Sequence, residues 1–151
     1  MDRKTLATLS GLEQMQALLR GDILRARMSQ TLDFALIEVE DGRAVFEGVP
    51  QSDKHNNPMG GIHGGWYATL LDSAMGCAVQ TRMPPGRGYT TAELSVNLVR
   101  AAKPDGPKLR AIGTVLHAGR QLATAEGRIV DDEGRLYAHG TTTCMVFELP
   151  P

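Results

Sequence analysis

The feature that most constrains this chain is a glycine-rich stretch, residues 57–65, which reads NPMGGIHGG and runs directly into an apolar segment. One proline and four glycines in nine residues exclude a regular element, so the stretch is predicted to be a loop. From Trp66 to Thr81, small and apolar residues recur every three or four positions without a proline, which predicts a helix. Gly64 and Gly65 then lie where that helix begins. The first N–H groups there have no partner inside the helix and carry the positive end of its dipole, so they suit a carbonyl oxygen or an anion.

An acidic residue, Asp72, lies inside the predicted helix. The simpler reading is a solvated aspartate on the outer side of the helix, because aspartate is mostly exposed in proteins. Gly64 and Asp72 are eight positions apart, which corresponds to about 12 Å along a straight helix. Catalytic contacts need roughly 2.6–3.2 Å. If both residues act on one reacting group, they must therefore come from different copies of the chain.

Length and composition favour one ordinary globular domain. The chain has 151 residues, of which 42% are hydrophobic and 22% charged, and its formal net charge is −1. This balance gives no electrostatic case for binding nucleic acid or a membrane surface. The N-terminus lacks the apolar core of a signal peptide, and no stretch approaches the ~20 apolar residues of a membrane span. Cys77 and Cys144 lie far apart with no nearby ligand-type partner, which disfavours a metal site or a disulfide framework and indicates a cytoplasmic protein.

The first 30 residues are predicted to form a helical segment that precedes the main domain at 31–151. Ser10 and Glu13 have the spacing of a capping box, and the helix that they begin is predicted to end at Gly21. Residues 22–28 are predicted to form a second short helical turn.

The remainder of the chain reads as strands joined by short turns. Asp41-Gly42 marks a hairpin turn, and the segment 84–88, PPGRG, interrupts the helical pattern. Consecutive strands with short connections predict an antiparallel sheet, and the whole is an α+β architecture with a sheet of about six strands. The strands are expected at about 32–40, 43–49, 91–98 (half-buried), 109–116, 122–130 and 136–148.

The motif Asn57-x5-His63-Gly64-Gly65-x6-Asp72 resembles the signature of hotdog-fold acyl-CoA thioesterases of the phenylacetate-pathway (PaaI-type) branch. The agreement extends from about Phe34 to Phe147. The resemblance implies a long central helix wrapped by a curved antiparallel sheet, and self-association as a homodimer or a dimer of dimers, usually a homotetramer. It also implies hydrolysis of thioesters of coenzyme A or of an acyl carrier, with no cofactor other than the coenzyme A of the substrate and no metal. The further matching segments are EDGR at 40–43, TAEL at 91–94, HAGR at 117–120 and DEGRLYA at 132–138.

The resemblance also assigns roles to residues whose plainer interpretations are structural. Asp72 would be the general base or the nucleophile, and the backbone N–H of Gly64 would polarise the thioester carbonyl. His63 would orient the loop or assist the leaving thiolate, although a lone histidine beside glycines is more often structural. Asn57, otherwise a turn former before proline, would reach the substrate or a water molecule. Thr91, otherwise an ordinary strand threonine, would hold the nucleophilic water.

A second group would bind coenzyme A. The turn formed by His117, Gly119, Arg120 and Gln121 would lie near its nucleotide and pantetheine parts, where a cation suits a phosphate; the plainer interpretation is a hairpin turn with a solvated arginine. In one departure, some relatives carry serine at the position of Gly76. The resemblance would also place three residues in the acyl pocket, although such residues near a helix more often belong to the core: Trp66, Tyr67 and Met75.

Other functional classes stay open at this level. A non-catalytic acyl-CoA-binding domain of the same fold would lack turnover, and the presence of Asp72 argues against it. A hotdog dehydratase or hydratase would need a histidine about five residues after the aspartate, where this chain has Cys77. A purely structural oligomer would leave the glycine-rich start of the helix without a purpose.

Overall fold

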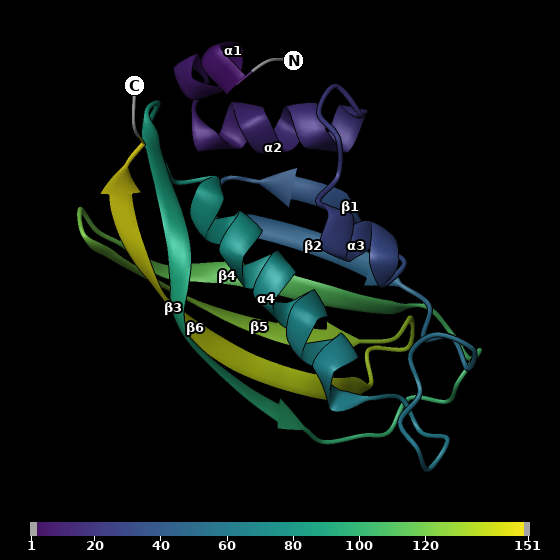
Figure 1. Cartoon of the computed structure of the whole chain (residues 1–151). Coiled ribbons are helices and arrows are strands. Elements are labelled where there is room, and N and C mark those ends of the chain that lie inside the picture. The colour runs from purple at the N-terminus through teal and green to yellow at the C-terminus, as the bar shows by residue number, and fades with distance from the viewer. Residues whose placement is uncertain (1–2, 150–151) are drawn as a thin grey trace.

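The computed structural model describes residues 3–149, which fold as one curved antiparallel sheet wrapped around a long helix (Figure 1). The sheet has six strands in the order β1-β2-β4-β5-β6-β3, and every neighbouring pair is antiparallel. This is the predicted α+β hotdog architecture. The elements are α1 (Arg3–Thr8), α2 (Gly11–Arg20), α3 (Arg27–Thr31), β1 (Phe34–Glu40), β2 (Arg43–Gly48), α4 (Gly64–Gln80), β3 (Arg87–Leu98), β4 (Leu109–Ala118), β5 (Leu122–Val130) and β6 (Leu136–Glu148).

Helix α4 packs closely on the sheet because two facing strands carry glycine where it crosses them. Gly113 of β4 pairs with Gly127 of β5, and Gly127 pairs with Gly140 of β6, so three glycines form one row across the sheet. A Cβ atom on Gly113 would collide with the backbone of Ala74, and one on Gly127 would lie 2.9 Å from Cγ of Met75. Gly113 and Gly127 therefore allow α4 to lie close against the sheet.

We expect Gly113→Ala to lower the free energy of unfolding by about 1–3 kcal/mol, since the added methyl group overpacks the contact with the α4 backbone. Urea denaturation followed by circular dichroism measures the change. Thr114→Ala is the matched control, because the exposed Thr114 is the next residue along β4 and its side chain lies on the other face of the sheet. Equal stabilities of the two variants would contradict the close approach.

The N-terminal segment differs in part from the prediction. The Ser10–Glu13 capping box is present, and Gly21 ends α2 in the left-handed conformation, with φ 83°. The expected helical turn at residues 22–28 is wrong. Just after the Gly21 cap, the Asp22 carboxylate accepts a hydrogen bond from the Arg20 side chain, and the residues that follow are non-helical. The short helix α3 begins only at Arg27. Helix α1 lies within the segment of residues 1–30 that was predicted to be helical, although no separate helix was predicted before Ser10.

Strand β3 is longer and more exposed than predicted. It begins at Arg87 and not at Thr91, because long-range pairing with β6 (Arg87 opposite Glu148) overrides the local Pro-Gly signal. The strand lies at the edge of the sheet. The expectation of a half-buried strand is also wrong for the single chain, because most of its C-terminal half is exposed, with Leu94 37% and Leu98 50% accessible.

Within residues 3–149, no helix has both the length and the apolar character needed to cross a membrane.

Candidate active site

The glycine-rich loop is held in shape by Asn57. Its side-chain Oδ1 accepts hydrogen bonds from the backbone N–H of Met59 (2.9 Å) and of Gly61 (3.1 Å). Its backbone N–H donates to the Gly61 carbonyl at 2.7 Å, which closes the loop. The side-chain Nδ2 has no hydrogen-bond partner among the described residues. Asn57 is thus both a turn former and the carrier of a free amide donor.

His63 ends the loop and caps α4. Its Nδ1 accepts a hydrogen bond from the Gly65 N–H (2.9 Å), and its carbonyl accepts one from the Trp66 N–H (3.0 Å). These contacts engage the second and third N–H groups of the helix. The N–H of Gly64, the first helical residue, has no acceptor within residues 3–149. It is therefore the free donor at the positive end of the α4 dipole.

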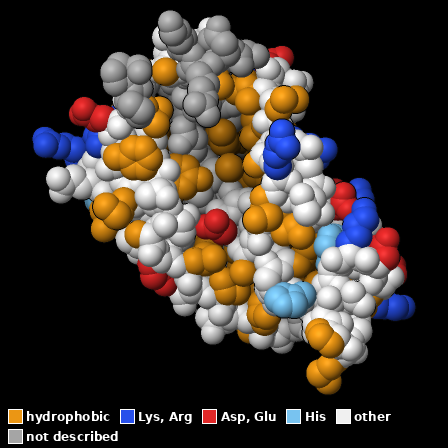
Figure 2. Space-filling model, viewed as in Figure 1, with side chains coloured by type: hydrophobic (Ala, Val, Ile, Leu, Met, Phe, Trp, Pro, Cys, Tyr) orange, Lys and Arg blue, Asp and Glu red, His pale blue; other side chains and the backbone are white. Residues whose placement is uncertain are grey.

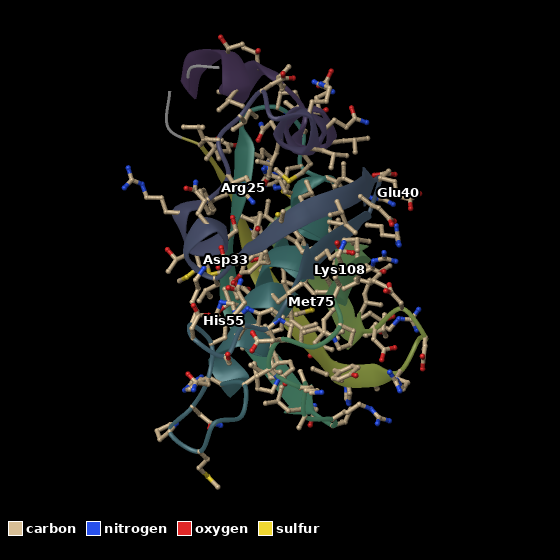
Figure 3. All side chains as sticks on the ribbon, turned by 90° about the vertical axis from the view of Figure 1, so that its right-hand side faces the viewer. Arg25, Asp33, Glu40, His55, Met75 and Lys108 are labelled. Atoms are coloured by element: carbon tan, nitrogen blue, oxygen red, sulfur yellow. The ribbon has the colours of Figure 1, made fainter. Side chains whose placement is uncertain are left out.

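A buried histidine, His55, is hydrogen-bonded to the end of this loop. His55 accepts a hydrogen bond from the Gln51 N–H at Nδ1 (3.0 Å), and its carbonyl accepts one from the His63 N–H (2.7 Å). Its ring packs on Trp66, with the centroids 5.6 Å apart. Figure 3 shows His55 and Asp33 on the same side of the molecule, but burial outweighs this nearby carboxylate and lowers the pKa of His55. His55 is therefore neutral and structural.

Asp72 on α4 is hydrogen-bonded to Thr91 on β3. The Thr91 hydroxyl donates to Asp72 Oδ1 at 2.9 Å. The hydroxyl proton is thus used to orient the carboxylate, whereas the sequence interpretation gave Thr91 the role of holding a water molecule. Oδ2 of Asp72 has no hydrogen bond to any described residue, and Asp72 is only partly buried. This arrangement leaves one carboxylate oxygen available to accept a proton.

Asp72 also lines a cavity of about 220 Å³ between α4, the hairpin β1–β2 and the N-terminal segment. Figure 2 shows the face of the molecule that carries α4, where hydrophobic side chains gather around a hollow with an acidic side chain near its middle. The cavity is part apolar and part polar. Its lining residues are Leu18, Arg25, Ala26, Ser29, Leu36, Phe46, Asp72, Ser73, Cys77 and Tyr89.

Cys77 lines this cavity but is not a nucleophile at neutral pH. Burial, with a further contribution from the Asp72 carboxylate, raises the pKa of its thiol to about 12. Since the thiolate is the reactive form of cysteine, the protonated Cys77 thiol is a poor nucleophile.

The four residues expected to contact coenzyme A lie together. His117, Gly119, Arg120 and Gln121 line an open hollow of about 380 Å³ beside Leu122. The Gly119 N–H donates to the Leu122 carbonyl at 2.8 Å, and Arg87 of β3 donates to the carbonyl of Arg120. The backbone of the turn is therefore fixed, while the Arg120 side chain is exposed.

Sequence reasoning missed part of the cavity. Trp66, Tyr67 and Met75 belong to the buried core, the plainer of their two interpretations, and do not line the cavity. Tyr89 and the N-terminal segment do line it. No local pattern points to Tyr89, because its position follows from the early start of β3. Within one chain, Gly64 and Asp72 remain eight residues apart on α4.

Comparisons with known proteins agree with this architecture. The family model described as Thioesterase superfamily matches residues 59–138, which include α4 and Asp72. The Halobacterium salinarum protein named "Putative esterase VNG_1336C" is 32% identical over 106 residues, which cover 66% of this chain and 68% of that protein.

Solved structures give the same result. A phenylacetic acid degradation-related protein from Ralstonia eutropha is 26% identical and has a TM-score of 0.77, with 86% of this chain and 97% of that chain covered. The PaaI protein of E. coli has a TM-score of 0.78 over 93% of this chain and 100% of its own; at 18% identity, this likeness shows the fold alone.

Proposed function

Since the chain belongs to the Thioesterase superfamily and is a thioester hydrolase of the hotdog PaaI-type branch, we propose that it hydrolyses acyl-CoA thioesters to a free acid and coenzyme A. The observation that carries the proposal is that one helix presents a free N-terminal N–H at Gly64 and a partly buried carboxylate at Asp72 that lines a cavity. The first group stabilises an oxyanion, and the second removes a proton from water.

The reaction needs no group beyond these residues and water. The Gly64 N–H donates to the thioester carbonyl oxygen, where negative charge develops; one such donor contributes roughly 2.7–4 kcal/mol to transition-state stabilisation. Asp72 Oδ2 takes a proton from water as the water oxygen bonds to the carbonyl carbon. The C–S bond then breaks, and the proton passes to the leaving sulfur. In the second form of the mechanism, Asp72 attacks the carbonyl carbon and the C–S bond breaks, so that the thiolate leaves; water then hydrolyses the resulting anhydride to the acid and free Asp72.

We place Gly64, His63 and Asn57 of one protomer opposite Asp72 and Thr91 of its partner. The support is the distance of about 12 Å between Gly64 and Asp72 along one helix, which exceeds the reach of one reacting group. A second support is the exposed edge strand β3, which carries accessible Leu94 (37%) and Leu98 (50%) beside unpaired backbone groups. An isologous dimer built through this edge contains two equivalent sites.

The turn around Arg120 suits the phosphates of coenzyme A, because an exposed guanidinium stands on a fixed backbone beside an open hollow. The proposal includes a homodimer or a dimer of dimers acting in the cytoplasm without a metal or a further cofactor.

The test is a hydrolysis screen of the purified full chain against aryl, short, medium and long acyl-CoA esters, with a thiol reagent reporting released coenzyme A. We expect turnover of at least one ester class. Tight binding of acyl-CoA without turnover of any ester would favour the non-catalytic binding domain instead.

A further inference from the structure

His55 links the glycine-rich loop to the rest of the fold through two connected turns, and its side chain is only 3% exposed. In the first turn, the His55 backbone N–H donates to the Gln51 carbonyl (2.9 Å), and the Gln51 N–H donates back to His55 Nδ1 (3.0 Å). In the second, the His63 N–H donates to the His55 carbonyl (2.7 Å). The ring therefore closes the turn whose last residue fixes His63, the residue before Gly64.

The same turn is fastened to the body of the protein on both sides of the ring. On one side, Gln51 Nε2 donates to the carboxylate of Asp33 (3.0 Å), in the link between α3 and β1. On the other side, the His55 ring packs on Trp66 of α4, whose indole N–H donates to the Leu32 carbonyl (3.1 Å). The ring thus lies between two anchored groups, so the shape of the loop depends on the bond that the ring accepts.

The ring fits this place only in its neutral form. Because Nδ1 is an acceptor, the proton of the neutral imidazole lies on Nε2, and this buried nitrogen has no hydrogen-bond partner among the described residues. A second proton would have to bind Nδ1, where it would face the Gln51 N–H as donor against donor. The cation would then be buried without an acceptor at either nitrogen. Protonation of the ring and closure of the turn therefore exclude each other.

The charged groups around His55 do not offset this cost. Burial has the largest effect and lowers the pKa of His55 below its ordinary value of 6.5, against the attraction of Asp33 (Figure 3). Lys54 lowers the pKa further, Asp53 raises it, and the neighbouring ring on α4 is the uncharged Trp66. Because the fold opposes protonation, the contribution of His55 to stability is complete above about pH 6.5 and is lost as the pH falls through the lowered pKa.

We propose that His55 is a positioning residue for hydrolysis: its ring acceptor holds the loop that presents the Gly64 N–H to the thioester carbonyl, and protonation of the ring releases that loop and stops turnover. The inference rests on the proposed thioesterase function and adds a pH-dependent control of its oxyanion donor. His55 touches no reacting atom and acts through His63, whose ring caps α4 at Gly65. A shift of about 1 Å at such a donor is enough to lower a rate about 10²-fold.

The experiment measures kcat and KM between about pH 4 and pH 8 for the best acyl-CoA ester of the screen, by the loss of thioester absorbance. His55→Asn is the conservative variant, because it places an amide oxygen near the position of Nδ1 and does not titrate. We expect its kcat at pH 8 to stay within about fivefold of the wild-type value. One pH unit below the midpoint of the wild-type acid limb, the wild-type protein keeps about a tenth of its plateau kcat/KM, and His55→Asn should keep at least about three times that fraction.

His55→Phe removes the acceptor but keeps a ring on Trp66. We expect its kcat to fall by about tenfold or more at pH 8, with KM within about threefold, because the misplaced donor acts mainly on charge that develops in the transition state. His139→Asn is the matched control, since His139 is an exposed histidine on β6, and its pH profile should follow that of the wild-type protein. Thermal unfolding at pH 8 checks the fold of each variant.

Coincident acid limbs of the wild-type and His55→Asn proteins would overturn the inference, and so would a folded His55→Phe protein with the wild-type kcat at pH 8. If His55→Phe does not fold, the comparison of the wild-type and His55→Asn profiles decides alone. Each of these results leaves hydrolysis by the wild-type protein intact, so the proposed function would stand. A wild-type protein that hydrolyses none of the esters at any pH would overturn both.

Discussion

Asp72→Asn is expected to lower kcat by roughly 10²–10⁴-fold, because the amide has the shape of the carboxylate but does not accept a proton from water. Binding should change little. The Thr91 hydroxyl can still donate to the amide oxygen, so the hydrogen bond seen at 2.9 Å is retained. The measurement is steady-state hydrolysis of the best ester found in the screen, together with direct titration of a non-hydrolysable acyl-CoA thioether.

Asp132→Asn is the control for this variant, since Asp132 is an exposed acid at the β5–β6 turn away from the cavity. Its kcat should match that of the wild-type protein. If Asp72→Asn retained more than about a tenth of the wild-type rate, Asp72 would be neither general base nor nucleophile.

The second large effect is predicted for Gly64→Pro, which removes the proposed oxyanion donor without breaking α4. Gly64 is the first helical residue, where proline is well tolerated because the N–H has no partner inside the helix. His63 has the extended backbone, φ −65° and ψ 134°, that a residue before proline adopts. We expect kcat to fall by about 10²–10³-fold while the helical content stays unchanged.

Gly64→Ala is the control that distinguishes the loss of the N–H donor in Gly64→Pro from the effect of a larger side chain. A Cβ atom at this position lies 3.0 Å from Cδ1 of Leu98, the flexible end of a side chain, and alanine keeps the N–H group. Its rate should stay within about tenfold of the wild-type rate. A Gly64→Pro protein as active as Gly64→Ala would show that this N–H does not contact the reacting carbonyl.

Local signals were enough to predict the elements that position the proposed site. The glycine-rich loop, the start of α4 near Gly64 and the Asp41-Gly42 hairpin depend on turn chemistry and helix periodicity, which neighbouring residues determine. The free N–H of Gly64 also follows from sequence, because the first N–H groups of a helix have no partner inside it; the cap from His63 to Gly65 was seen only in the structure.

Long-range contacts decided what could not be predicted. Strand β3 begins at Arg87 because β6 pairs with it, and only that early start brings Tyr89 beside Gly76. The link around Arg25 lines the same cavity as α4 because of the tertiary fold, and no periodic pattern marks such a segment. The exposure of Leu94 and Leu98 has the same origin, since an edge strand is recognised only once the strand order is known.

The most direct test of the shared site mixes two inactive proteins, Gly64→Pro and Asp72→Asn, under conditions in which subunits exchange. If each site takes its N–H from one protomer and its carboxylate from the other, a mixed dimer holds one intact site and one doubly altered site. Random exchange of equal amounts makes half of the dimers mixed, so about a quarter of the wild-type activity should return. No recovery of activity, with exchange demonstrated by differently tagged chains, would contradict the account.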